Sequence, residues 1–429
     1  MKADMIIKGT QQPSGTVVVS GAKNSATRLL AAALTAGETV RLRNFPTYLI
    51  DAVEKIRFMR DLGANVEVDH ENATVEVATQ QLSCRPNLDY QVPIRTTYLL
   101  AAGQLARNEV ACIPYPGGCR IGNRGYDLHI MVWKALGCDV VEEEHFIRVR
   151  GKLRGNCIDF PISTVGGTEN ALICAAVAVG ESEIRNAYVS PEVHDLIHLL
   201  RTMGAQIDNY GNSLIRVRGC GGLLRGASYA VMPDRIEALT WIVFGVLSGG
   251  SICIEGVPFE HMQAPLLHLQ EAGIDIFRNT HCALINNICM KGDGIQPFEL
   301  ACGTHPGVIS DMQPFFTLLG MKARGTSRIY DYRYPERIAY ARELNLFCPG
   351  SVTCEPGQIT TRGAKPLSAA DVMSTDLRGS MALVMCAFCA GGTSRVIGVD
   401  LALRGYNDLA GKLRSLGLNF DIVETANGD

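Results

Sequence analysis

The chain has 429 residues, about three times the ~150 residues of a typical domain, so at least two folded units are expected. Hydrophobic residues make up 47% of the sequence and charged residues 19%, which excludes a disordered or fibrous chain. The formal net charge of −3 argues against binding to a nucleic-acid duplex, which usually requires a basic excess.

The sequence also indicates a compartment. Residues 1–9 lack the apolar segment of a secretory signal, and the longest apolar run, residues 171–179, is too short to cross a bilayer. The 15 cysteines follow no disulfide framework, so we expect reduced thiols in a cytoplasmic protein. Cys386 and Cys389 share one face of an apolar helix and are expected to be buried, and no metal site is predicted.

A motif that ends a helix recurs six times along the chain. Its copies, 67 to 74 residues apart, are Leu62-Gly63-Ala64, Leu136-Gly137-Cys138, Met203-Gly204-Ala205, Ala272-Gly273-Ile274, Leu344-Asn345-Leu346 and Leu416-Gly417-Leu418. Each central Gly or Asn suits the left-handed position after a helix, and alternating strand patterns follow. The repeat predicts an α/β protein of two domains with three units each, and its hinges are expected near residues 21–22 and 232–233.

The first functional candidate in chain order is Ser-Gly-Ala-Lys-Asn-Ser at 20–25, which precedes an Ala/Leu-rich helix. Free backbone N–H groups and Lys23 at a helix start favour an anion. An ordinary capped helix with a surface lysine explains the same residues.

The loop at 114–125 is a stronger candidate. It contains two Pro and four Gly, which is typical of a lid or a series of tight turns. Arg120 and Arg124 closely follow Cys119, and neighbouring cations lower the pKa of a thiol. We therefore expect Cys119 to be the reactive cysteine.

Several acidic and basic residues stand at helix starts in the second half of the chain. Asp311 is expected to be either an N-cap of the helix that follows it or a functional carboxylate. Asp234, Asp376 and the Arg404 segment have the same two interpretations. Together they could line a cleft with anion donors.

Eight motifs in collinear order resemble those of the enolpyruvyl transferase family. They are Ser-Gly-Ala-Lys-Asn at 20–24, Pro-Gly-Gly-Cys-x-Ile-Gly-x-Arg at 116–124, Asp-Leu-His at 127–129, Val-Gly-Gly-Thr-Glu-Asn at 165–170, Pro-Asp-Arg-Ile-Glu at 233–237, Ser-Asp-Met-Gln at 310–313, Thr-Asp-Leu-Arg at 375–378 and Arg-Gly-Tyr at 404–406. The resemblance implies two inside-out α/β barrel domains, each of three βαβαββ repeats, with a cleft between them. Residues 23–232 would form the first domain, and residues 1–22 with 233–429 the second.

The resemblance also implies a reaction, in which enolpyruvyl moves from phosphoenolpyruvate (PEP) to a sugar hydroxyl of a uridine nucleotide and phosphate is released. It implies small-molecule substrates, no cofactor, no nucleic acid and no membrane. Cys119 would protonate C3 of PEP or form its adduct, and Asp311 would take the acceptor proton. Lys23 and Asp376 are the other residues implied to be catalytic. Those implied to bind the substrates are Arg95, Arg124, Arg337, Arg378 and Arg404 in the charged part of the site, and Asn24, Arg28, Asp127, Leu128, His129, Thr164, Val165 and Gly166 near the acceptor.

The sequence departs from the family pattern at four positions on the acceptor side. They are Arg28, where the family is apolar or Pro; Gly125, where it has Pro; Ile162, where it has a Lys that contacts the nucleotide; and Pro335, where a Glu-Asn-Arg run begins. Arg28 is therefore interpreted either as a contact to the anionic group of the acceptor or as a surface residue.

These departures leave the acceptor open. UDP-N-acetylglucosamine is expected first, and a smaller nucleotide such as UMP is the alternative. A non-catalytic nucleotide-binding relative is disfavoured because Cys119, Lys23 and Asp311 are all present. The shikimate-pathway relatives lack the Cys loop and are less similar.

Overall fold

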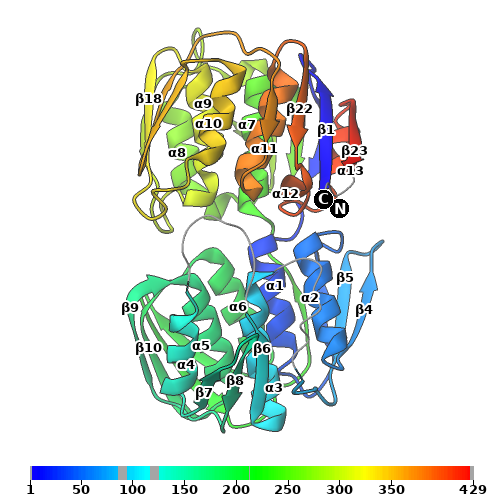
Figure 1. Cartoon of the computed structure of the whole chain (residues 1–429), viewed down its shortest axis with the longest axis vertical. Coiled ribbons are helices and arrows are strands. Elements are labelled where there is room, and N and C mark those ends of the chain that lie inside the picture. Colours follow the sequence, from blue (N-terminus) through cyan, green and yellow to red (C-terminus); the bar gives the residue numbers. More distant parts are fainter. Residues whose placement is uncertain (1, 86–93, 116–124, 212, 426–429) are drawn as a thin grey trace. The chain divides into compact units, whose positions relative to one another are not determined.

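The computed structural model describes residues 2–85, 94–115, 125–211 and 213–425. These residues divide into two compact units. The first unit consists of the described residues between 21 and 232, and the second of residues 2–20 and 233–425. Each unit combines helices with small sheets (Figure 1), so the predicted α/β class is confirmed. Among the described residues the sheets are separate and none closes on itself; the four-stranded sheets are mixed, and the three-stranded sheet is antiparallel.

The first unit contains three sheets. Their orders are β13-β3-β5-β4, β6-β8-β7 and β11-β12-β10-β9. The strands are β3 (Val40–Arg43), β4 (Asn65–Asp69), β5 (Thr74–Ala78), β6 (Val110–Pro114), β7 (Asp139–Glu142), β8 (Phe146–Arg150), β9 (Cys157–Thr164), β10 (Val179–Ala187), β11 (Gln206–Tyr210), β12 (Leu214–Cys220) and β13 (Ala227–Ala230). The helices are α1 (Lys23–Ala33), α2 (Ile50–Asp61), η1 (Arg95–Leu100), α3 (Ala101–Asn108), α4 (Asp127–Ala135), α5 (Val165–Val177) and α6 (Pro191–Thr202).

The second unit also contains three sheets, with the orders β15-β16-β14-β2, β17-β18-β20-β19 and β21-β22-β1-β23. Its strands are β1 (Lys2–Lys8), β2 (Ser14–Val18), β14 (Ser251–Glu255), β15 (Phe277–Arg278), β16 (Cys282–Ile285), β17 (Glu299–Ala301), β18 (Thr326–Tyr330), β19 (Val352–Glu355), β20 (Gln358–Arg362), β21 (Asp371–Met373), β22 (Thr393–Ile397) and β23 (Phe420–Thr425). Its helices are α7 (Arg235–Ser248), η2 (Phe259–His261), α8 (Gln263–Glu271), η3 (Asn287–Cys289), η4 (Ser310–Met312), α9 (Gln313–Lys322), α10 (Ala339–Leu344), η5 (Asn345–Phe347), α11 (Leu377–Cys389), α12 (Asp400–Leu403) and α13 (Leu409–Ser415).

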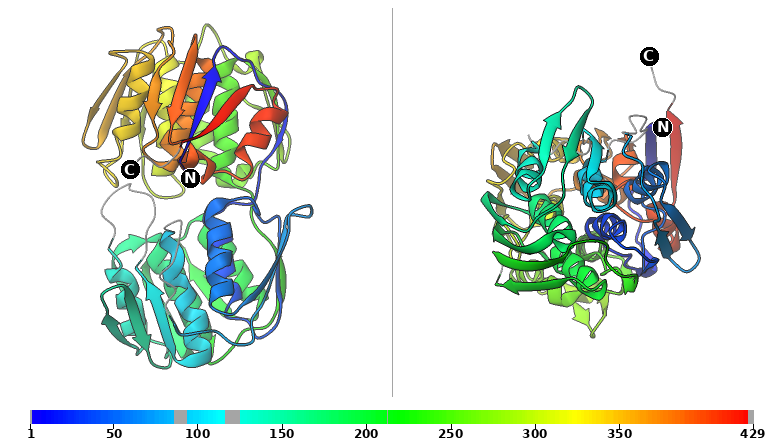
Figure 2. Two further views of the ribbon diagram at one scale, coloured as in Figure 1. Left: turned by 45° about the vertical axis from the view of Figure 1, so that its right-hand side comes forward. Right: turned by 90° about the horizontal axis from the view of Figure 1, so that it is seen from below.

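The four-stranded sheets share one pairing scheme. An outer strand pairs in parallel with the next, as β9 does with β10 and β17 with β18, and two antiparallel strands complete the sheet. Three sheets take a strand from far away in the sequence. β13 pairs with β3, β2 pairs with β14, and β1 lies between β22 and β23 (Figure 2).

The turns after the helices follow the sequence motif closely. Five of its six central residues have a positive φ, where only glycine avoids a clash of its own Cβ. They are Gly63, Gly137, Gly204, Gly273 and Gly417. The prediction is wrong for Asn345, whose φ is −63°. There the chain continues from α10 into η5, and the Asn345 side chain accepts a hydrogen bond from the backbone N–H of Val352 at 3.1 Å.

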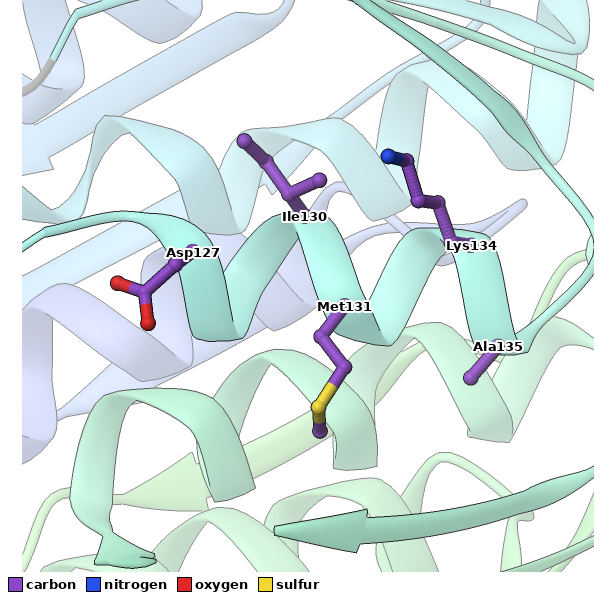
Figure 3. A pocket seen from close by; sticks show the side chains of 5 residues that line it. All are labelled: Asp127, Ile130, Met131, Lys134 and Ala135. Carbon is purple, nitrogen blue, oxygen red and sulfur yellow. The ribbon is translucent and has the colours of Figure 1, made fainter. Parts of the chain in front are cut away.

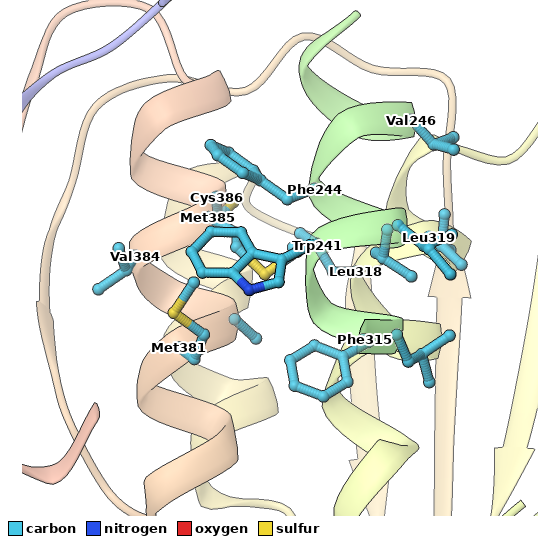
Figure 4. Packing of buried hydrophobic residues seen from close by; sticks show 14 of the residues in the cluster. Trp241, Phe244, Val246, Phe315, Leu318, Leu319, Met381, Val384, Met385 and Cys386 are labelled. Atoms are coloured by element: carbon cyan, nitrogen blue, oxygen red, sulfur yellow. The ribbon is translucent and has the colours of Figure 1, made fainter. Parts of the chain in front are cut away.

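Helices form the interior of each unit. In the first unit, α5 packs against α3, α4 and α6 and against the third sheet. In the second unit, Trp241 and Phe244 of α7 lie against Met381 of α11 and Phe315 of α9 (Figure 4), and all four side chains are fully buried. No helix in the described part of the chain is long and apolar enough to span a membrane.

Candidate active site

The start of α1 presents the first group of predicted residues. α1 begins at Lys23, after Ala22 in extended conformation, and no described side chain caps it. Lys23 Nζ lies 2.9 Å from Asp51 Oδ2 of α2, and both side chains are 15% exposed. Asn24 is half-buried, and the Ser25 hydroxyl donates to the buried Asp195. The ammonium group that sequence analysis singled out is therefore held in place by a neighbouring helix.

Arg28, one turn further along α1, forms a buried ion pair. Its Nε donates to both carboxylate oxygens of Glu169 in α5, at 2.9 and 3.0 Å, and its Nη1 donates to Thr27 Oγ1 at 2.9 Å. Burial alone would lower the pKa of Arg28, but Glu169 raises it above its ordinary value. The interpretation of Arg28 as an ordinary surface residue is wrong, because long-range packing with α5 covers its side chain.

The starts of α4 and α5 bring a second group together. The His129 ring stacks on Tyr98, with centroids 3.5 Å apart. A Cβ at Gly166 would lie 2.6 Å from Tyr98 Oη and 3.3 Å from His129 Cε1, so only glycine fits at this approach. Thr164 caps α5 by accepting from the N–H of Gly167 at 3.3 Å. Residues predicted from two separate motifs thus lie side by side.

Asp127, Leu128 and Val165 lie at the same helix starts. Leu128 and Val165 are partly buried against the core of the first unit. Asp127 is exposed and borders a shallow depression of about 550 Å³ along α4 (Figure 3). The depression is lined by Asp127, Ile130, Met131, Lys134 and Ala135. Because Asp127 is the one predicted residue among them, this depression does not by itself define a substrate site.

Asp311 of the second unit lies between two buried guanidinium groups. Asp311 Oδ1 is 3.5 Å from Arg337 Nη1, and Asp311 Oδ2 is 3.9 Å from Arg378 Nε. The Asp311 side chain is 29% exposed, whereas both arginines are almost completely buried. Met312 occupies the N-cap position of α9, and Asp311 lies inside η4. The interpretation of Asp311 as an N-cap is therefore wrong, because its carboxylate faces the arginines.

The other two aspartates do cap helices. Asp234 accepts from two backbone N–H groups of α7, at 2.8 and 3.1 Å. Asp376 accepts from two of α11, at 3.0 and 3.1 Å, and from Arg337 Nη2 at 2.7 Å. The predicted capping roles of both are confirmed, and Asp376 also holds Arg337 in place.

Both arginines are fixed by several partners. Arg337 Nη1 donates to the carbonyl of Ser310 at 2.5 Å. Arg378 Nη1 donates to the carbonyl of Gly405 at 3.0 Å, and its guanidinium lies 4.9 Å from the centre of the Tyr406 ring. Burial alone would lower the pKa of both arginines, but Asp376 and Asp311 raise that of Arg337, and Tyr406, Asp234 and Asp311 raise that of Arg378. Both groups therefore remain cations around Asp311.

Three predicted residues lie wholly or partly outside the described residues. Cys119 and Arg124 are among them, and so is the side chain of Arg95, whose backbone begins η1. Arg404 is half-buried at the C-terminus of α12, next to the Gly405 carbonyl that binds Arg378.

Sequence analysis missed three side chains that contact the predicted residues or their neighbours in the chain. Asp51 pairs with Lys23, and Tyr98 stacks on His129. Lys55 is completely buried in α2. The burial of Lys55 could have been predicted from the sequence, because Lys55 lies on the apolar face of a helix at a core position. Asp51 and Tyr98 carry no such signal.

Comparisons with known proteins give matches that cover almost the whole chain. The sequence model of the EPSP synthase (3-phosphoshikimate 1-carboxyvinyltransferase) family matches residues 7–413. The UDP-N-acetylglucosamine 1-carboxyvinyltransferase of Acidobacterium capsulatum is 36% identical over 426 residues, covering 96% of this chain and 94% of that protein. The enzyme of that name from Trichlorobacter lovleyi is 34% identical, covering 98% and 99%.

Solved structures show the same fold. The enolpyruvyl transferase NikO from Streptomyces tendae superposes with a TM-score of 0.88 at 24% identity, covering 99% of this chain and 100% of that one. An EPSP synthase from Acinetobacter baumannii gives a TM-score of 0.74 at 15% identity, with the same coverage. The motifs, the fold and the full-length matches lead to one conclusion: the chain belongs to the enolpyruvyl transferase family, as its sequence predicted.

Proposed function

We propose that this chain transfers the enolpyruvyl group of PEP to the 3'-hydroxyl of UDP-N-acetylglucosamine and releases phosphate, a step in the synthesis of peptidoglycan precursors. The support from sequence is that relatives of this name match almost its full length. The support from structure is the placement of Asp311. Of Asp234, Asp311 and Asp376, Asp311 is the one whose carboxylate does not cap a helix. It lies partly exposed between two buried cations.

In the proposed reaction, Asp311 accepts the proton of the acceptor hydroxyl as its oxygen bonds to C2 of PEP. Cys119 delivers a proton to C3, which gives a tetrahedral intermediate. Return of a C3 proton to the Cys119 thiolate and departure of phosphate, which takes the proton held by Asp311, then restore the double bond. General acid and base groups of this kind contribute typically 10²–10⁴-fold each.

The placement of Asp311 suits a base. Arg337 and Arg378 fix its carboxylate from the buried side, while part of the side chain stays open to a ligand. A preoriented base needs no reorganisation when the proton moves. Asp376 is proposed to serve the reaction through Arg337, which it binds at 2.7 Å.

Further residues are proposed to bind the substrates. Lys23, Arg95, Arg124 and Arg404 would bind the phosphate and carboxylate of PEP, since arginine forms paired hydrogen bonds with such groups. Near the acceptor we propose Asn24 for the sugar, and Asp127, Leu128, His129, Thr164, Val165 and Gly166 for the uridine nucleotide. The close approach of Gly166 to His129, which leaves no room for a Cβ, supports this last group.

UMP remains the second candidate for the acceptor, and one observation favours it. Ile162, where the family has a lysine, is 63% exposed on β9 and offers no charge to a second phosphate. The pairing of Arg28 with Glu169 argues the other way, because Arg28 is already committed to a carboxylate.

We also propose the detailed architecture of the two domains and the cellular compartment in which the protein acts. Each unit would be an inside-out α/β barrel, with the first domain at residues 23–232 and the second at residues 1–22 and 233–429. The buried helices α5 and α11, each within its own unit, support this arrangement. The protein is proposed to act in the cytoplasm, where both substrates would be found.

The test is phosphate release from PEP with UDP-N-acetylglucosamine and UMP in parallel. We expect turnover with UDP-N-acetylglucosamine and at least tenfold lower kcat/KM with UMP. Ile162→Lys serves as a matched variant, because restoring the charge should improve use of the diphosphate only. The reverse preference in the wild-type protein would replace the first acceptor by the second, and no release with either would contradict the proposed function.

A further inference from the structure

Three ionisable side chains lie close together inside the first unit, and we name them the Arg28 cluster: Arg28 of α1, Lys55 of α2 and Glu169 of α5. Glu169 and Lys55 are completely buried. Arg28 binds both oxygens of Glu169. Lys55 Nζ donates to the carbonyl of Thr27 at 2.7 Å and to Thr96 Oγ1 of η1 at 2.9 Å.

Buried charges are a costly way to join helices. Removing ions from water is unfavourable, and well-packed hydrophobic residues often hold an interior equally well. Burial lowers the pKa of Lys55 well below its usual range, whereas Glu169 keeps Arg28 charged. The planar guanidinium of Arg28 is oriented by two of its nitrogens, because both oxygens of Glu169 share its Nε–H and Thr27 Oγ1 accepts from its Nη1. Such a pair fixes the distance and angle between α1 and α5 more closely than apolar packing does.

Three of the elements that the cluster joins, α1, η1 and α5, carry proposed substrate residues close by, and α2 carries the partner of one of them. Lys23 and Asn24 begin α1, five and four residues before Arg28. Asp51, the partner of Lys23, lies one turn before Lys55 in α2. Arg95 precedes Thr96 at the start of η1. Residues 164–166 begin α5, within about one turn of Glu169.

We infer that the Arg28 cluster positions the starts of α1, η1 and α5, so that the anion-binding residues of the first unit are held ready for the substrates. The inference rests on the proposed function, which gives these starts their ligands. Arg28 and Glu169 are then positioning residues that act through the helices they join. Arg28 influences the acceptor site in this way, without binding the acceptor itself.

The test uses the full-length protein with Arg28→Met, Glu169→Met, the double variant and Arg28→Lys. Each single variant leaves one buried charge without its partner, so we expect a lower Tm and a KM for PEP about 10- to 100-fold higher, the scale of a small misplacement. In the double variant the Arg28–Glu169 pair is gone and Lys55 keeps its hydrogen bonds to Thr27 and Thr96, so Tm should recover while KM stays raised. Arg28→Lys should keep Tm and give an intermediate KM, because an ammonium lacks the directional geometry of Nε.

Arg395→Met is the matched control. Arg395 of the second unit binds the buried Asp4 through Nε and Nη2, at 2.9 and 2.5 Å. This variant should lower Tm and leave KM within twofold of wild type. A KM that follows Tm through the whole series, control included, would reduce the Arg28 cluster to a purely structural role and overturn the inference.

A second readout does not depend on any substrate. Hydrogen exchange of the backbone amides in α1 and α5 should speed up at least tenfold in Arg28→Met, while exchange in α7 and α9 stays unchanged. If the wild-type protein turned over no nucleotide, the proposed function would fail, and the exchange pattern would still decide the inference. Unchanged exchange in α1 and α5 would overturn it.

Discussion

Asp311 and Asp376 both touch Arg337, yet the structure predicts opposite effects for the same substitution. Asp311 lies 3.5 and 3.9 Å from its arginines and is partly exposed, so Asp311→Asn removes two long ion pairs worth about 0–1 kcal/mol together. Both arginines keep a carboxylate partner, Asp376 for Arg337 and Asp234 for Arg378. Stability should therefore change little. If Asp311 is the base, turnover should fall about 10²–10⁴-fold, which corresponds to roughly 2.7–5.4 kcal/mol in the activation free energy.

Asp376→Asn should mainly lower the stability of the second unit. Asparagine caps a helix about as well as aspartate, so the change isolates the charge pair with Arg337 at 2.7 Å. Breaking a buried ion pair costs about 3–5 kcal/mol. For a unit of this size each kcal/mol lowers Tm by about 2–4 °C, so the second unit should melt roughly 6–20 °C lower.

Calorimetry and phosphate release on the two variants check both statements together. The reasoning requires that Asp311→Asn separates activity from stability. Equal losses of Tm in the two variants would show that Asp311 is a structural partner of the arginines. Turnover of Asp311→Asn within a few-fold of wild type would remove it from the proposed mechanism.

Three further predictions follow from other features. Gly137→Ala should lower the free energy of unfolding by about 1–2 kcal/mol, because its φ of +85° strains any Cβ, whereas Asn345→Gly should bring no gain at its φ of −63°; equal effects in denaturant titrations would contradict this. Burial raises the pKa of Asp195, so the native state binds its proton more readily, and stability should fall as the pH rises above about 3.9, the unfolded value. Asp195→Asn should flatten this part of the pH profile, and an unchanged slope would be evidence against it. Cys119 should be the cysteine alkylated by an epoxide analogue of PEP such as fosfomycin, and peptide mapping that located the label elsewhere would refute the assignment.

Features that depend on the local backbone geometry, such as turns and helix caps, could be predicted from the sequence. The helix-ending glycines were found because a positive φ leaves few other residues, and each turn depends only on its neighbours. Asn345 departs from the pattern because an extra turn of helix, η5, follows it. The capping roles of Asp234 and Asp376 were predictable for the same local reason.

Contacts between distant residues could not be predicted in this way. The pair of Arg28 and Glu169 joins residues 141 positions apart, and nothing near Arg28 in the sequence indicates its partner. Asp311 was ambiguous because its arginines follow it by 26 and 67 positions. The roles of Cys119, Arg124 and the other site residues remain predictions.

The place of β1 in its sheet has a consequence for how the protein is made. β1 is an inner strand of its sheet, and both of its partners come from the last part of the chain. During synthesis at about 5–20 residues per second, residues 2–8 must wait roughly 20–80 s before β23 emerges. The first unit can complete its sheets as soon as β13 has left the ribosome. β1 is therefore made long before either of its partners and is among the last strands to pair, so Met5 and Ile7, which are fully buried in the folded unit, must stay soluble until then.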